Sequence, residues 1–125
     1  MDEDQVSVRY IVDDVEAAID FYVEHLGFTL ASHPAPPFAD VVRGRLRLLL
    51  SGPASSGGRA TPTDLEGPGR NRIQVVVSDL DAHVERFRAS GVALRSDVVE
   101  GPGGRQVLLA DPAGNLVEVF EPASR

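Results

Sequence analysis

The chain has 125 residues and a mass of 13.4 kDa, which fits one domain or two small units sharing one core. Hydrophobic residues (42%) and charged residues (25%) are near the averages of globular proteins. No apolar run approaches the roughly 20 residues that span a bilayer, so we expect a cytoplasmic protein without a membrane partner. The formal charge of −7 argues against a nucleic-acid partner, because phosphate binding needs a basic face.

The residue types narrow the available chemistry. Cysteine is absent, which removes thiolate nucleophiles and Cys-ligated metal centres. All 12 basic residues are Arg, so no Lys can form a Schiff base or serve a P-loop. Any chemistry must come from carboxylates, three His, hydroxyls, Arg or a bound cofactor.

The first half of the chain begins with a β-branched run that predicts a strand at residues 8–12. Asp14 is a suitable N-cap for an amphipathic helix that starts at Val15 and stops at Gly27. Three further strands are predicted at residues 28–30, 39–43 and 46–50. The Pro-rich residues 33–37 are predicted to be an extended link rather than part of a strand.

The second half repeats this pattern. A strand at residues 73–77 precedes Asp79, a second N-cap, and a helix from Leu80 that stops at Gly91. Strands are then predicted at residues 92–94, 106–110 and 116–120. Each half is therefore β-α-β-β-β, with the first module at about 5–51 and the second at about 71–122. The Gly/Pro/Ser-rich residues 52–70 are a flexible connector or, alternatively, a flap over a site.

Two segments carry a family resemblance. They are VDDVEAAIDFY at residues 12–22, leading to LGF at residues 26–28, and DPAGNLVE at residues 111–118. With the repeated module, they resemble the vicinal oxygen chelate superfamily of glyoxalases, bleomycin-resistance proteins and dioxygenases. The resemblance covers nearly the whole chain and implies a single α+β domain, residues 1–125, whose two tandem modules form a cupped mixed sheet. It also implies a homodimer, often with a divalent metal in the cup.

Strand alternation predicts independently which side chains face away from the helices, because the helix-facing set must be apolar. Val8 and Tyr10 pack inward in the first strand, and Ile73 and Val75 do so in its counterpart. The cup-facing residues of the four relevant strands are then Ser7, Arg9 and Ile11; Arg47, Leu49 and Ser51; Arg72, Gln74 and Val76; and Leu116, Glu118 and Phe120.

The resemblance places the family's four metal-ligand positions at Ser7, Leu49 (or Leu48), Arg72 and Glu118. Only Glu118 is a competent ligand, and an Arg at a ligand position repels a cation. The three His lie on no cup-facing strand position. The sequence therefore predicts no cofactor, with a divalent metal bound through Glu118 as the alternative.

Arg72 and Glu118 occupy positions that meet at one metal in the family, so we expect a salt bridge in which the guanidinium replaces the cation. A structural ion pair without a ligand is the competing interpretation. Glu118 is the one candidate catalytic residue. The predicted ligand-binding residues are Ser7, Arg9, Phe38, Arg47, Leu49, Arg72, Gln74, Glu118 and Phe120.

Three functions remain open. The first is metal-free binding of a small organic molecule in the cup, in a sequestering or resistance role. The acidic residues crowded into 2–4 and 13–24 are compatible with a cationic antibiotic, although a solvated helix face explains most of them. The second is a lyase, isomerase or dioxygenase with Glu118 on a metal. The third is a structural or regulatory module whose cup is plugged by Arg72 and Glu118.

Overall fold

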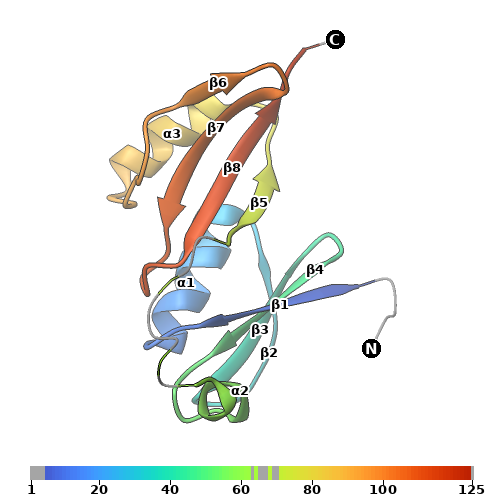
Figure 1. The fold of residues 1–125 in the computed structure, drawn as a ribbon, viewed down its shortest axis with the longest axis vertical. Coiled ribbons are helices and arrows are strands. Elements are labelled where there is room, and N and C mark those ends of the chain that lie inside the picture. Colours follow the sequence, from blue (N-terminus) through green and yellow to red (C-terminus); the bar gives the residue numbers. More distant parts are fainter. Residues whose placement is uncertain (1–4, 63, 65–67, 69–70, 125) are drawn as a thin grey trace. The chain divides into compact units, whose positions relative to one another are not determined.

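The computed structural model describes residues 5–62, 64, 68 and 71–124, so the predicted acidic residues 2–4 lie outside it. The chain forms two compact units, Met1–Gly67 and Pro68–Arg125. Each unit contains a four-stranded sheet and a long helix, in the strand–helix–three-strand order that the sequence predicts (Figure 1). No helix of the described part is long and apolar enough to cross a membrane.

The first sheet has the strand order β1-β4-β3-β2. Its strands are β1 (Val6–Ile11), β2 (Thr29–Ala35), β3 (Phe38–Arg43) and β4 (Leu46–Ser51). β1 runs parallel to β4, and the other neighbours are antiparallel. Alternate residues of these strands form the core, and Val41, Leu48 and Leu50 are fully buried. Burying a side chain of this kind contributes about 1.5–3 kcal/mol.

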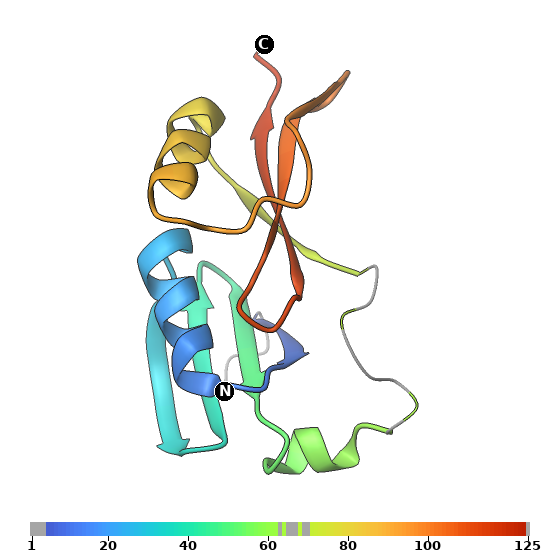
Figure 2. The same ribbon diagram turned by 90° about the vertical axis from the view of Figure 1, so that its left-hand side faces the viewer.

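Helix α1 (Val15–Leu26) packs against β2, β3 and β4 through its apolar stripe, which includes the fully buried Tyr22 (Figure 2). The carboxylate of Asp14 caps the helix by accepting a hydrogen bond from the backbone N–H of Ala17 at 3.0 Å. Gly27 ends it with a left-handed φ of 72°, a conformation that glycine adopts without a Cβ penalty. Both predicted helix boundaries are confirmed.

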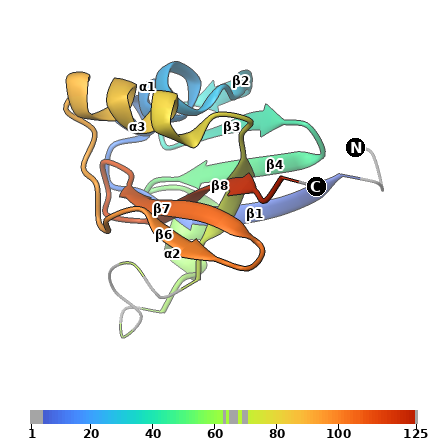
Figure 3. The ribbon, with the colours of Figure 1, turned by 90° about the horizontal axis from the view of Figure 1, so that it is seen from above.

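The second sheet repeats the topology, with the strand order β5-β8-β7-β6. Its strands are β5 (Ile73–Val76), β6 (Val99–Gly101), β7 (Gly104–Ala110) and β8 (Leu116–Pro122), and β5 is parallel to β8. β6 and β7 form a hairpin (Figure 3). Helix α3 (Leu80–Ala89) packs on β7 and β8 and is capped by Asp79, which accepts from the backbone N–H of Ala82 at 3.1 Å.

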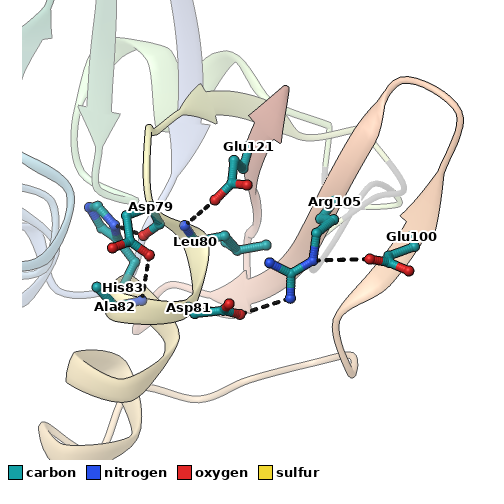
Figure 4. Close-up of polar contacts among 8 residues, drawn as sticks. All are labelled: Asp79, Leu80, Asp81, Ala82, His83, Glu100, Arg105 and Glu121. Atoms are coloured by element: carbon teal, nitrogen blue, oxygen red, sulfur yellow. Dashed lines mark hydrogen bonds and ion pairs between the residues drawn. The ribbon is translucent and has the colours of Figure 1, made fainter. Parts of the chain in front are cut away.

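Polar side chains tie α3 to the strands of its own sheet (Figure 4). Glu121 at the end of β8 accepts from the backbone N–H of Leu80 at 2.7 Å, which satisfies a second donor of the first helical turn. Arg105 on β7 bonds Asp81 of α3 at 2.7 Å and Glu100 of β6 at 3.4 Å. The hydrogen bond from Arg105 lowers the pKa of Asp81. These contacts join the helix, the hairpin and the central strand.

Two strand predictions are wrong in their limits. β2 extends to Ala35, so it includes part of the Pro-rich segment, and its pairing with β3 shifts register on both sides of Ser32. Such irregularities let a strand accommodate residues that cannot complete a regular ladder. In the second module, Leu94 forms only an isolated bridge with Leu109, and the strand proper lies later, at Val99–Gly101.

The described part of the predicted connector is not purely irregular. A short helix, α2 (Ser56–Ala60), begins at Ser55, whose hydroxyl accepts from the backbone N–H of Gly58 at 3.0 Å. α2 packs against β1 and β4. Residues 63, 65–67, 69 and 70 of the predicted connector or flap lie outside the described residues.

Replacing the first helix cap tests the local account of α1. We expect Asp14→Ala to lower the free energy of unfolding by about 1 kcal/mol, because the Ala17 N–H loses its acceptor. Asp14→Asn should keep most of that stability. The neighbouring exposed Asp13, changed to Ala, is the matched control. Urea unfolding measures all three, and equal losses in Asp13→Ala and Asp14→Ala would contradict the capping role.

Candidate functional site

In each module, one face of the sheet is turned away from its long helix, and we call this the distal face. The alternation predicted from the sequence is confirmed in β5, where Ile73 and Val75 are buried while Gln74 and Val76 are exposed. The predicted binding residues differ in burial: Ser7, Arg9, Arg72 and Gln74 are exposed, Phe38, Arg47 and Phe120 are half-buried, and Leu49 and Glu118 are buried.

The second module holds a buried carboxylate that accepts two side-chain hydrogen bonds. Glu118, on the central strand β8, is only 7% exposed. Its Oε1 accepts from Nε of Arg72 at 3.0 Å, and its Oε2 accepts from Nε2 of Gln74 at 2.6 Å. A buried carboxylate without donors would cost several kcal/mol, and these two bonds satisfy both oxygens. The predicted Arg72–Glu118 salt bridge is confirmed.

The hydrogen bond from Gln74 to Glu118 was not predicted, because the sequence indicated Gln74 only as a cup-facing, ligand-binding residue. The parallel register between β5 and β8 places Gln74 directly opposite Glu118. Arg72 precedes β5 and reaches Glu118 diagonally, through its Nε. The alternating apolar residues of the two strands put Gln74 and Glu118 on the same face, and the register between the strands makes them neighbours.

The guanidinium of Arg72 retains unused donors. Among the described residues, its only hydrogen bond is the one through Nε. Arg72 is an exposed residue, and its side chain is 35% exposed. Its terminal nitrogens thus have no hydrogen-bond partner among the described residues and belong to a side chain that solvent reaches.

On the distal face of the first module, three strands place their side chains in rows. One row is Arg9, Leu49 and Asp40, from β1, β4 and β3 respectively. Arg9 donates from Nη1 to the hydroxyl of Ser51 at 2.8 Å. A Cβ on Gly57 would collide with this guanidinium, so helix α2 packs closely against Arg9.

A second buried carboxylate lies in that row, and the sequence-based prediction did not include it. Asp40 is 4% exposed. It accepts from Nε of Arg47 at 2.6 Å and from the hydroxyl of Ser32. The signal was present, because Ala39 and Val41 alternate with Asp40 in a predicted strand and are fully buried on the helix side.

The pKa of Asp40 reflects these contacts. Burial by itself raises the pKa of this carboxyl, because it disfavours the charged form. The hydrogen bonds from Ser32 and Arg47, with the charge of Arg47, outweigh that effect and hold the pKa below its usual range. Asp40 is therefore ionised at neutral pH, and Arg47 compensates its charge.

The residues do not fit a metal centre of the family type. The four positions taken from the resemblance carry Ser7, Leu49, Arg72 and Glu118, and both oxygens of Glu118 already accept hydrogen bonds. No group of three or more His, Asp or Glu in the described part of the chain is arranged to hold a metal ion. Divalent sites in this chemistry need about three such donors.

Comparison with known proteins identifies the family. The sequence profile of the glyoxalase/bleomycin resistance protein/dioxygenase superfamily matches residues 5–119. The chain belongs to this superfamily. The α+β fold with two modules, predicted from the sequence motifs, is confirmed by solved structures of the same superfamily.

Relatives within the superfamily differ in what they are described as doing. A solved structure of TnmS3 from Streptomyces sp. CB03234, described as an antibiotic binding protein, is 30% identical, has a TM-score of 0.75 and overlaps 95% of each chain. Lactoylglutathione lyase from Agrobacterium tumefaciens is 26% identical, with a TM-score of 0.75 over 96% of this chain and 94% of that one. An uncharacterised protein of Mycolicibacterium smegmatis is 27% identical over 90% of this chain and 89% of its own length.

A double-mutant cycle measures the Arg72–Glu118 bond. Arg72→Met should cost about 1 kcal/mol of unfolding free energy, because a buried carboxylate loses a charged donor that is itself partly solvated. In a Glu118→Leu background the same substitution should cost much less. Arg88→Met, an exposed change in the last turn of α3, is the matched control. Equal costs in both backgrounds would show that the ion pair adds no stability.

The lowered pKa of Asp40 predicts a pH dependence. Above about pH 4 its ionised form adds stability, and this increment is lost as the pH falls through the lowered pKa of Asp40. Asp40→Asn should therefore lose less stability on acidification than the unchanged protein, as measured by urea unfolding at a series of pH values. In Arg47→Gln, NMR titration should show the carboxyl of Asp40 with a higher pKa. Identical acid profiles for Asp40→Asn and the unchanged protein would rule out this linkage.

Proposed function

We propose that this protein binds a small organic molecule on the distal face of a sheet without a catalytic metal, in a sequestering or resistance role. One observation carries the proposal. The only ligand-type residue at the family's metal positions, Glu118, has both oxygens engaged by Arg72 and Gln74. A cation at Glu118 would lie beside a guanidinium whose charge repels it.

The comparisons support this proposal as one of two functions found at similar identity. TnmS3 is described as an antibiotic binding protein, and the Agrobacterium relative as a lyase. A shared fold does not decide between binding and catalysis. The side chains of this chain that could bind a metal or a ligand must therefore distinguish the two functions. Neutralised carboxylates and unused guanidinium nitrogens suit hydrogen bonding to a ligand better than coordination of a metal.

The predicted binding residues of the second module offer a ligand both apolar and polar contacts. Phe120 is half-buried and lies beside Val76 in the register of β5 and β8, which offers an aromatic surface to a flat ligand. The terminal nitrogens of Arg72 offer donors, and Glu118 fixes the orientation of that guanidinium through Nε. The proposal includes the homodimer and the cytoplasmic location expected from the sequence.

Metal dependence is the direct test. The protein is treated with EDTA, and its melting temperature is then measured with and without about 1 mM Zn²⁺, Ni²⁺, Mn²⁺ or Mg²⁺. A site with a dissociation constant near 1 μM would add about 4 kcal/mol and raise the melting temperature by about 10 °C or more. We expect no such rise. A stoichiometric metal in the purified protein, or a rise of that size lost in Glu118→Gln, would favour the metal-dependent enzyme instead.

Ligand binding is tested on the same EDTA-treated protein. A thermal-shift screen of cationic antibiotics and small organic carboxylates should yield compounds that stabilise it equally with and without added metal. The shift should fall in Phe120→Ala and Arg72→Met but persist in Arg88→Met. Stabilisation that appears only with metal would overturn the metal-free proposal.

A further inference from the structure

We infer that the distal face of the first module, taken by itself, binds a carboxylate or similar organic anion through Arg47 and Arg9. This inference rests on the proposed function, since it names the chemical class of the small molecule. It concerns residues other than those that carry that proposal. The observations are the charges on the three strands, the free donors of Arg47 and the apolar residue beside both arginines.

The charge balance favours an anion. Of the charged side chains on β1, β3 and β4, strand alternation places Arg9, Arg47 and Asp40 on the distal face. Asp40 compensates Arg47, whereas the hydrogen-bond partner of Arg9 is the neutral hydroxyl of Ser51. Among the described side chains of these three strands, one positive charge is thus left without a charged partner, although the chain as a whole carries −7. A local field of this kind attracts an anion whatever the net charge.

The guanidinium of Arg47 is held in place while its donors remain free. In the described part of the chain, its only hydrogen bond is from Nε to Asp40, and its side chain is 21% exposed. Asp40 is buried and is itself fixed by Ser32. A planar guanidinium anchored through Nε presents its two terminal nitrogens as a fork, which matches the two oxygens of a carboxylate.

An apolar residue lies beside both arginines. Leu49 lies on β4, flanked by Arg9 on β1 and by Asp40 on β3, and Arg47 is two residues earlier on the same face of β4. Leu49 is 9% exposed, and an apolar body in contact with its exposed edge would bring an attached carboxylate within reach of a guanidinium. This geometry selects an aryl or alkyl carboxylate over a small inorganic anion, because the apolar contact adds to the charged one.

Three matched probes test the inference: 2-naphthoate, neutral 2-naphthamide and 2-naphthylmethylammonium. Binding is followed at pH 7 by NMR chemical-shift titration of the backbone amides of β1 and β4. We expect 2-naphthoate to bind most tightly and to shift Arg9, Leu49 and their neighbours. Loss of a charged hydrogen bond should weaken its binding about tenfold in Arg47→Gln.

Arg45→Gln is the matched control, because it removes the same charge at an exposed position in the turn before β4. This variant should bind 2-naphthoate as tightly as the unchanged protein does. Arg9→Gln is the second test variant, because it orphans no buried carboxylate if Arg47→Gln fails to fold. Equal affinity for the ammonium probe, unchanged binding in both test variants, or no shifts in β1 and β4 would overturn the inference. The metal-free proposal is tested by a separate measurement, the change in melting temperature when metal is added.

Discussion

A carboxylate buried on a β-sheet must meet hydrogen-bond donors, and this constraint shapes the distal face of both modules. Asp40 and Glu118 are 4% and 7% exposed, and each accepts a bond from an arginine Nε and from one further side chain. The helix side of each sheet is filled by Val, Leu and Ile, so the distal face is the remaining place for these polar groups. In both modules the carboxylate orients a guanidinium rather than acting as a free acid.

The repeated module and the two helix caps could be predicted from local sequence pattern. The Arg72–Glu118 contact was predicted from the resemblance to the superfamily, which places both residues at positions that meet at one metal. The contacts of Gln74 and Asp40 could also be predicted once the register of the neighbouring strands is known. Helix α2 could not be predicted from the sequence. Its sequence contains two glycines, which disfavour a helix, and it depends on the Ser55 cap and on packing against Arg9. The position of β6 likewise depends on pairing with β7, which local propensity does not record.

Membership of the superfamily fixes the architecture and leaves the chemistry to a few side chains. Two relatives at similar identity are described as an antibiotic binding protein and as a lyase, on the same fold. This chain has an arginine at a position that the resemblance assigns to a metal ligand, beside a buried acid whose two oxygens already accept hydrogen bonds. The same features that disfavour a metal favour an acceptor-bearing organic molecule.

The ion pairs of the second module differ in a way that ionic strength would separate. Arg105 bonds Asp81 and Glu100, whose side chains are 72% and 76% exposed, whereas Arg72 bonds a carboxylate that is 9% exposed. Added salt screens the exposed pairs strongly and the buried one little. In concentrated salt the β6–β7 hairpin therefore loses its electrostatic tie to α3, while the Arg72–Glu118 bond on the distal face persists.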